Sequence, residues 1–477
     1  MPAVGPPPLT SLMRHLVLLL GLVLPAIAAP FSARFEEIKR TAKPAELYTF
    51  LYALPKGGDL HNHLGGAGRA EWWYALATDP ARNGGDTFYT RVKFGAPLDA
   101  GSSLVLFSTI RQYAYDRLSA AEQADYARLD RLAPEQKQAW LDSIRLDRPG
   151  EGRAEFFNVT WPRLGQLFSS LPVYTGILVE NLRAFGAEGL AYLETQFGVL
   201  HFTDNQGRLI PPETAVAFVK QRLAQPDVVA TGVTVRFQEM VLRYAPDAEA
   251  QLETLYQFVD THRDLWVGLN MAGIEENDKG NATRFLAKYR ELRGRYPTLA
   301  LSIHAGEMDG PDSHVRDTLL LGASRIGHGV NLIQDPETLL LLQQTRRVLV
   351  EINLISNRLL EYTPDLTKHP FPEYLRTGVP VCLNTDDRGM WDSNLTDEYY
   401  TAITTYNLSW DEIVLLGRNS LTYSFVQPDV KAKLLADFER AVAAFEAKYL
   451  PADSLGQLAA VKPVTYGYAK RTWGFGF

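Results

Sequence analysis

The stretch LWVGLNMAGIEENDKGNATRFLAKYRELRGRYPTLALSIHAGE, residues 265–307, holds two apolar runs with a helical pattern between them. Residues 265–273 and 300–307 are short and rich in apolar side chains, as buried strands are, whereas residues 281–296 repeat their apolar positions with helical spacing. Two strands joined by a helix form a parallel pair, because the helix carries the chain back to the start of the sheet. This stretch therefore predicts one unit of an α/β fold.

The same unit recurs along the chain. Short apolar runs alternate with stretches that mostly carry helical patterning, such as residues 212–225 and 248–264. The eight predicted strands are residues 58–64, 190–197, 233–240, 265–273, 300–307, 325–332, 348–356 and 379–387. Eight such units predict a (β/α)8 TIM barrel, whose active site lies at the carboxyl ends of the strands.

Two segments fall outside this repeat. Residues 70–165 follow the first strand as an inserted segment with helical patterning, in which Ser119 and Glu122 form a capping box. Because the insertion leaves from the carboxyl end of a strand, we expect it to cover the mouth of the active site or to contribute to association. The chain from residue 397 onward predicts a helical C-terminal extension. We expect residues 29–477 to form one domain.

The first residues are typical of a targeting segment. Arg14 and His15 precede a nine-residue apolar run, and small residues follow at Ala26 and Ala28, which predicts a signal peptide over residues 1–28. Nine apolar residues are too few to span a bilayer, so we expect no stable membrane span after cleavage. We therefore expect an exported protein, periplasmic or extracellular. An uncleaved N-terminal anchor is the alternative.

Composition limits the classes of partner and of fold. With 477 residues, of which 46% are hydrophobic, the chain can bury a large core, and we expect one elaborated domain. A formal net charge of −7 gives no basic surface for a phosphate backbone, so nucleic acid is not an expected partner. Cys382 is the single cysteine, so no intrachain disulfide forms. The sequence leaves the oligomeric state open, and a homodimer is one of the alternatives.

Polar side chains end four of the predicted strands. The first such strand lies in GGDLHNHLGGA (residues 57–67), where two histidines two positions apart point to the same side of an extended strand. The residues at the four ends are His61 and His63, His304 and Glu307, His328, and Asp386 and Asp387. Three imidazoles and a carboxylate are a suitable ligand set for zinc, whose remaining position holds a water.

Each of these residues also has a structural interpretation. The histidine pair suits an exposed polar loop, His328 suits a core histidine bonded to a backbone carbonyl, Glu307 suits a solvated loop, and Asp387 suits a helix cap. Taken singly, these alternatives are the more common outcome. Random placement would scatter such residues over helices and loops as well, so their coincidence at four strand ends favours a site.

Six motifs in order carry a resemblance to a known family. They are PKGGDLHNHLGGA (55–67), MAGIEEN (271–277), HAGE (304–307), RIGHG (325–329), NTDD (384–387) and RNSLTYSF (418–425). Over about residues 45–430 the chain resembles the adenosine deaminase family of metal-dependent amidohydrolases. The signal peptide and the long insertion resemble its secreted, adenosine deaminase-related growth factor branch.

The resemblance implies a role for each matching residue. His61, His63, His304 and Asp386 would bind one zinc ion per chain, which lowers the pKa of bound water to near 7. Glu307 would donate a proton to the purine ring, and His328 would orient or deprotonate the attacking water. Gly273 and Asp387 would hold the purine. The end of the fourth strand, LNMAGIE, offers no lysine to bridge a second metal ion, which favours one zinc.

The activity implied is the zinc-dependent hydrolytic deamination of adenosine or 2′-deoxyadenosine to inosine or 2′-deoxyinosine and ammonia. One alternative is a deaminase or hydrolase acting on another amino-heterocycle or a cyclic amide. A non-enzymatic alternative is a secreted receptor-binding protein that uses the barrel as a scaffold, although such a scaffold has no reason to keep all four ligands. The expected partner is a purine nucleoside substrate.

Four residues, in three motifs, depart from the family pattern. Gly65 stands where the family often has an aspartate that contacts the ribose, so recognition of the sugar is left open. Asn353 and Leu354 replace the commoner Cys-Pro pair, and Arg388 stands where proline is usual. None of these is a predicted zinc ligand.

Overall fold

A computed structural model describes residues 30–96, 105–276 and 278–477, so the predicted signal peptide lies outside the described residues. Eight strands form one sheet in which each pairs in parallel with the next. They are β1 (Lys56–His63), β5 (Leu190–Gln196), β6 (Thr234–Leu242), β7 (Trp266–Ala272), β8 (Ala300–Ala305), β9 (Arg325–His328), β10 (Leu349–Ile352) and β11 (Val381–Leu383). All eight predicted strands are present.

The first and last strands meet at a short seam. Asn62 and Asp386 form an isolated parallel bridge, in which the Asp386 N–H donates to the His61 carbonyl at 2.9 Å. Side chains complete the seam, because the Leu60 N–H donates to Asn384 Oδ1 at 2.9 Å. The sheet therefore returns to its starting strand, and the prediction of a (β/α)8 TIM barrel is confirmed.

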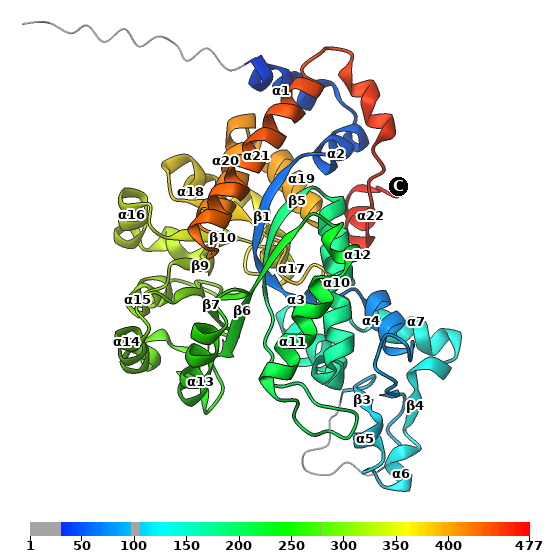
Figure 1. The fold of residues 1–477 in the computed structure, drawn as a ribbon. Coiled ribbons are helices and arrows are strands. Elements are labelled where there is room, and N and C mark those ends of the chain that lie inside the picture. Colours follow the sequence, from blue (N-terminus) through cyan, green and yellow to red (C-terminus); the bar gives the residue numbers. More distant parts are fainter. Residues whose placement is uncertain (1–29, 97–104, 277) are drawn as a thin grey trace, which may run out of the picture.

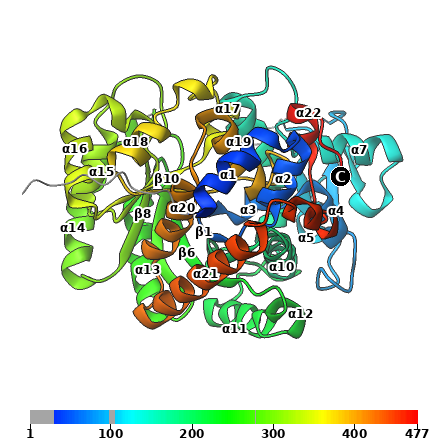
Figure 2. The same ribbon diagram turned by 90° about the horizontal axis from the view of Figure 1, so that it is seen from above.

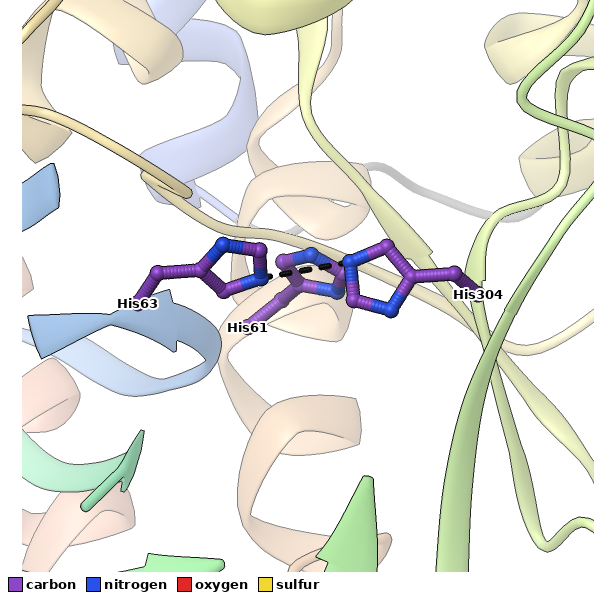
Figure 3. A group of neighbouring side chains, drawn as sticks. All are labelled: His61, His63 and His304. Carbon is purple, nitrogen blue, oxygen red and sulfur yellow. Dashed lines mark hydrogen bonds between the residues drawn. The ribbon is translucent and has the colours of Figure 1, made fainter. Parts of the chain in front are cut away.

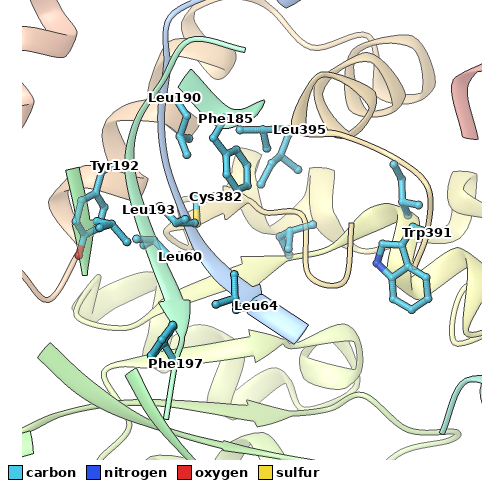
Figure 4. Close-up of a cluster of buried hydrophobic side chains, with 14 of the residues drawn as sticks. Leu60, Leu64, Phe185, Leu190, Tyr192, Leu193, Phe197, Cys382, Trp391 and Leu395 are labelled. Carbon is cyan, nitrogen blue, oxygen red and sulfur yellow. The ribbon is translucent and has the colours of Figure 1, made fainter. Parts of the chain in front are cut away.

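Helices surround the sheet, as Figures 1 and 2 show. Those that follow successive strands are α10 (Leu171–Ala187), α11 (Pro212–Leu223), α12 (Pro226–Val229), α13 (Ala248–Thr261), α14 (Leu286–Arg295), α15 (His314–Leu321), α16 (Pro336–Thr345), α17 (Leu354–Leu359) and α18 (Phe371–Thr377). Apolar side chains fill the space between the sheet and this layer. Figure 4 shows one such cluster, where Leu60 and Leu193 of neighbouring strands lie near Phe185 of α10.

The insertion contains a small sheet as well as helices. Helix α3 (Leu64–Ala67) directly follows β1 and precedes the insertion. The helices of the insertion are α4 (Ala70–Ala77), α5 (Gln112–Tyr115), α6 (Ala120–Gln123), α7 (Pro134–Asp142), α8 (Arg153–Glu155) and α9 (Trp161–Leu164). Helix α6 begins with the predicted capping box of Ser119 and Glu122. Between the helices, β2 (Phe88–Arg91) pairs antiparallel with β3 (Thr109–Arg111) and β4 (Tyr126–Arg128). These strands were not predicted from the sequence, because strands of three or four residues are too short to show a period.

The two ends of the described chain pack together beside the barrel (Figure 2). The N-terminal helices are α1 (Pro30–Thr41) and α2 (Pro44–Tyr52), and the predicted helical extension contains α19 (Leu395–Tyr406), α20 (Trp410–Thr422), α21 (Pro428–Tyr449) and α22 (Gly467–Trp473). Phe31 of α1 and Phe445 of α21 both pack on the Trp410 ring of α20. Within the described residues, no helix is both long enough and apolar enough to cross a membrane.

Candidate active site

The ends of β1, β8 and β11 bring the predicted metal ligands to one place. The Nε2 atoms of His63 and His304 lie 3.2 Å apart, and Asp386 Oδ1 lies 3.5 Å from His61 Nε2 and 3.6 Å from His63 Nε2. Figure 3 shows the three imidazoles turned toward one another. Ligand atoms around a tetrahedral ion at about 2.0–2.1 Å are roughly 3.3 Å apart, so this spacing suits one zinc-sized ion.

Unpaired polar atoms in the cluster support the same interpretation. His61 Nε2, Asp386 Oδ1 and Asp387 Oδ1 are buried, and each has no hydrogen-bond partner within the described chain. A buried polar atom without a partner costs on the order of 1–3 kcal/mol. A cation held by the lone pairs of His61 Nε2 and Asp386 Oδ1 removes that cost at these two atoms, so the residues present fit a metal ion.

Second nitrogens orient two of the ligand imidazoles. His61 Nδ1 lies 2.8 Å from a Glu351 carboxylate oxygen, and His304 Nδ1 lies 3.1 Å from the Met271 carbonyl oxygen. Because these oxygens can only accept, each Nδ1 carries the proton and each Nε2 offers a lone pair to the cluster. Glu351 is held in turn by the Arg325 guanidinium at 2.6 Å.

The charge balance at the cluster favours a cation. Burial lowers the pKa of His63 to about 4 and holds the pKa of His304 well below its ordinary value, so both rings are neutral at pH 7, the form that binds metal. Burial also disfavours the charged form of His61, but the Asp386 and Glu351 carboxylates outweigh it and raise its pKa to about 10. The space between these carboxylates therefore attracts positive charge, whether a proton or a metal ion carries it.

The two adjacent aspartates differ in charge. Burial raises the pKa of Asp387, and the neighbouring Asp386 carboxylate raises it further. Burial acts in the same direction on Asp386, but the His63 and His61 imidazoles outweigh it, and the pKa of Asp386 lies below its ordinary range. Asp386 is thus ionised, as a metal ligand would be, whereas Asp387 retains a proton that it can donate in a hydrogen bond.

Glu307 lies just beyond the end of β8 and has the properties of an acid. Burial raises its pKa well above the ordinary value, and the carboxylates of Asp386 and Glu275 add to the effect. The N–H groups of Gly306 and Glu307 both donate to Glu275 at 3.0 Å, and His314 Nδ1 lies 2.8 Å from the same carboxylate. Glu275 therefore fixes the turn that carries a protonated Glu307 into the cavity.

A chain of hydrogen bonds fixes the ring of His328. The Phe371 N–H donates to His369 Nδ1 at 3.1 Å, and His369 Nε2–H donates to Asn357 Oδ1 at 3.1 Å. The Asn357 and Asn353 amides then donate to His328 Nδ1 at 3.0 and 3.2 Å. Asn353, one of the departures from the family pattern, thus helps to hold a site residue.

Two site residues have backbone conformations that are unusual for side chains other than glycine. His328 has φ 62° and Asp386 has φ 52°, both in the left-handed region. Such a conformation costs on the order of 1–3 kcal/mol and persists where the surroundings enforce it. Here it turns each side chain from its strand end into the site.

The cluster opens into a cavity of about 680 Å³. Seven of the predicted residues line it, and the eighth, His61, is buried with its Nε2 3.5 Å from the lining residue Asp386. The lining residues from the sequence analysis are His63, Gly273, His304, Glu307, His328, Asp386 and Asp387. Gly273 has φ 102°, a conformation that favours glycine, and a Cβ there would lie 2.7 Å from the Tyr244 ring, so a larger residue would strain the backbone.

The inserted segment supplies an aromatic wall of this cavity, as expected of a segment at the carboxyl ends of the strands. The wall consists of Phe156, Phe157, Trp161 and, just beyond the insertion, Phe168. Trp161 and Phe168 stack at 5.5 Å, and a Cβ on Gly65 would lie 2.6 Å from Phe168 and 2.9 Å from Trp161. These two rings therefore occupy the space that a side chain at position 65 would need.

Arg388 plays no direct part in the site. Its guanidinium forms a buried ion pair with Glu188 and lies 4.0 Å from the centre of the Phe185 ring. The replacement of proline by arginine here thus ties the loop after β11 to the end of α10.

Four residues that position the site escaped the sequence analysis. They are Glu275, Glu351, Asn357 and His369. Glu275 stands inside the quoted motif MAGIEEN, and Glu351 and Asn357 stand at the ends of EINLISN, so the signal was present without an assigned role. Their partners are distant in sequence, which is why spacing alone did not identify them.

A closed parallel barrel with imidazoles and carboxylates gathered at its strand ends is the arrangement of a barrel enzyme, whose active site lies at that face. Solved structures share this fold. The chain superposes on the structure of an ADAL–IMP complex with a TM-score of 0.61 at 20% identity, covering 83% of this chain and 99% of that one. An amidohydrolase from Burkholderia ambifaria, with bound Zn, gives a TM-score of 0.55 at 20% identity, covering 86% and 97%.

Sequence comparison identifies the family within this class. The family model described as adenosine deaminase matches residues 161–441. An adenosine deaminase from Enterococcus faecalis is 32% identical over 256 residues, which are 53% of this chain and 72% of that protein. The chain belongs to the adenosine deaminase family, and it is a hydrolase that acts on the C–N bond of a purine amine.

Proposed function

We propose that this protein is an exported enzyme that converts adenosine or 2′-deoxyadenosine to inosine or 2′-deoxyinosine and ammonia, with one zinc ion per chain. The observation that carries the proposal is the meeting of His61, His63, His304 and Asp386 beside a protonated Glu307 in a single cavity. Such a site places an acid in the cavity beside a candidate cation site.

The zinc ion, when bound, supplies a water whose pKa is lowered to near 7. His328, whose ring the Asn353 and Asn357 amides keep in one orientation, would orient the attacking water. Glu307 donates its proton to the ring nitrogen next to the amino-bearing carbon, and neutralises the charge that attack at this carbon would place there. Asp387 and the backbone of Gly273 hold the purine so that this ring nitrogen faces Glu307.

Export rests on the N-terminal sequence. A positively charged start, an apolar run and small residues at Ala26 and Ala28 suit cleavage after residue 28. Sequencing the N-terminus of the protein recovered from the medium or periplasm tests this part, and an intact residue 1 in a cell-retained product would contradict it.

A direct assay tests the activity. Purified protein is incubated with adenosine, and the loss of absorbance near the purine maximum is followed together with the release of ammonia. We expect stoichiometric inosine and ammonia. A protein that holds its zinc but leaves adenosine, 2′-deoxyadenosine and other 6-aminopurines unchanged would contradict the proposal.

A further inference from the structure

The cavity extends from the metal ligands past the ends of β5 and β6, where a second group of polar residues lies. Gln196 ends β5, Glu239 lies near the end of β6, and His201 lies in the loop between them; all three line the cavity. Nothing in the deamination chemistry described above uses them.

The strand register sets the distance of this group from the metal cluster. His63 pairs with Gln196, and Gln196 pairs with Gln238, the residue before Glu239. Adjacent strands lie about 4.8 Å apart, so Glu239 lies roughly 10 Å from the ligand His63. This separation is comparable to the length of a purine nucleoside.

Glu239 is a buried carboxyl group that forms no ion pair with any residue that the structure describes. It is 2% exposed, and one of its oxygens accepts a hydrogen bond from the Val199 N–H at 3.2 Å. Burial raises its pKa to about 8, against the smaller effect of the Val199 and Met240 N–H groups. Near neutral pH the group is therefore mostly uncharged, and it can both donate and accept a hydrogen bond.

Space beside Glu239 is left by a glycine. The position that a Cβ on Gly198 would take lies 2.9 Å from Glu239 Oε2 and 3.7 Å from His201 Nδ1. The His201 Nε2–H donates to the Phe168 carbonyl at 3.2 Å, so Nδ1 carries a lone pair. A carboxyl oxygen and an imidazole lone pair thus border the same gap.

We propose that Glu239, with Gln196 and His201, forms a second subsite that binds the hydroxyl-bearing, uncharged part of the substrate remote from the reacting ring carbon. The inference rests on the proposed function and deepens it. A hydroxyl group both donates and accepts, as does this set of side chains. With Gly65 closed off by Phe168 and Trp161, this subsite is the place where the cavity recognises a sugar.

The same lining excludes a phosphorylated substrate. Among the described residues that line the cavity, none is lysine or arginine. A phosphate dianion placed beside Glu239 would lose its hydration without gaining a cation, which is strongly unfavourable. The enzyme therefore selects nucleosides over nucleotides.

The experiment compares adenosine, adenine and AMP as substrates of the zinc-loaded protein and of Glu239→Leu. For the wild type, kcat/KM for AMP is expected to be at least ~100-fold below that for adenosine. Loss of one hydrogen-bonding group is expected to raise the KM for adenosine about tenfold in Glu239→Leu, with kcat little changed and adenine kinetics unaltered. Glu239→Gln, which keeps a donor and an acceptor, should retain most of the affinity.

A matched control is Gln257→Leu, which removes an exposed polar side chain of the neighbouring helix α13 that lies outside the cavity lining. It should behave as the wild type.

Equal losses for adenosine and adenine, no loss in Glu239→Leu, or efficient use of AMP would overturn the inference. If the wild type deaminates no 6-aminopurine, the proposed function fails on its own. Calorimetric titration with inosine then decides the subsite: binding weakened by Glu239→Leu supports it, and equal or absent binding overturns it.

Discussion

The two walls of the cavity are built in different ways. One wall consists of the ends of β1, β8, β9 and β11, where buried hydrogen bonds hold nearly every polar side chain in one orientation. The other consists of the rings of the insertion, of which Phe156, Phe157 and Trp161 contact one another and the cavity mainly by apolar surface. The strands thus position the chemistry, and the insertion shapes the space for the substrate. Substitutions on the first wall should change kcat, and those on the second KM.

Removal of the metal gives the largest expected effect. Dialysis against a chelator should abolish turnover, because the ligand wall then holds no ion to activate water, and one equivalent of Zn²⁺ per chain should restore it. Metal analysis alongside the assay checks the stoichiometry. Active protein without metal, or two tightly held ions per chain, would contradict the single site formed by His61, His63, His304 and Asp386.

Substitution of the acid comes next. Glu307→Gln keeps the shape of the side chain but lacks a transferable proton, so kcat should fall at least ~100-fold, about 2.7 kcal/mol, with zinc retained. We would measure kcat, zinc content and melting temperature on one preparation. Near-normal kcat in a zinc-loaded variant would show that Glu307 is not the proton donor.

A smaller loss is expected at the residue that positions the acid. Glu275→Gln keeps one acceptor for the two N–H groups of Gly306 and Glu307 but loses the charge that faces His314. Supporting residues of this kind typically contribute 10–100-fold, so kcat should drop about tenfold while KM and zinc content stay near the wild-type values. A fall in melting temperature with normal kcat per folded molecule would indicate a structural role only.

The aromatic wall should give the smallest effect, and on a different parameter. Trp161→Ala removes part of the apolar surface next to Gly65, so KM should rise about tenfold with kcat within a few-fold of the wild type. Phe94→Ala is the control, because Phe94 belongs to the same insertion but is 44% exposed and lies outside the cavity lining. A hundredfold loss of kcat in Trp161→Ala would remove the distinction between the two walls.

The sequence predicted the first wall far better than the second. Strands such as Ala300–Ala305 carry a strong apolar signal, and a barrel topology places whatever follows them at one rim, so the sequence alone indicates that His304 and Glu307 belong to the site. The sequence does not indicate the partners that orient the site residues. For example, the Glu351 carboxylate that holds the His61 ring is 290 residues away in the chain. The aromatic wall belongs to an irregular segment, where neither periodicity nor spacing indicates which rings face the cavity.

The seam between β1 and β11 links the site to the integrity of the barrel. Its backbone bridge joins Asn62 to Asp386, and two metal ligands on β1 face a third ligand on the other side. A bound ion would therefore link the first and last strands, and its binding free energy would oppose separation of β1 from β11. In hydrogen–deuterium exchange, the seam amides of Leu60 and Asp386 should lose protection on chelation well before those of β7, on the opposite side of the sheet.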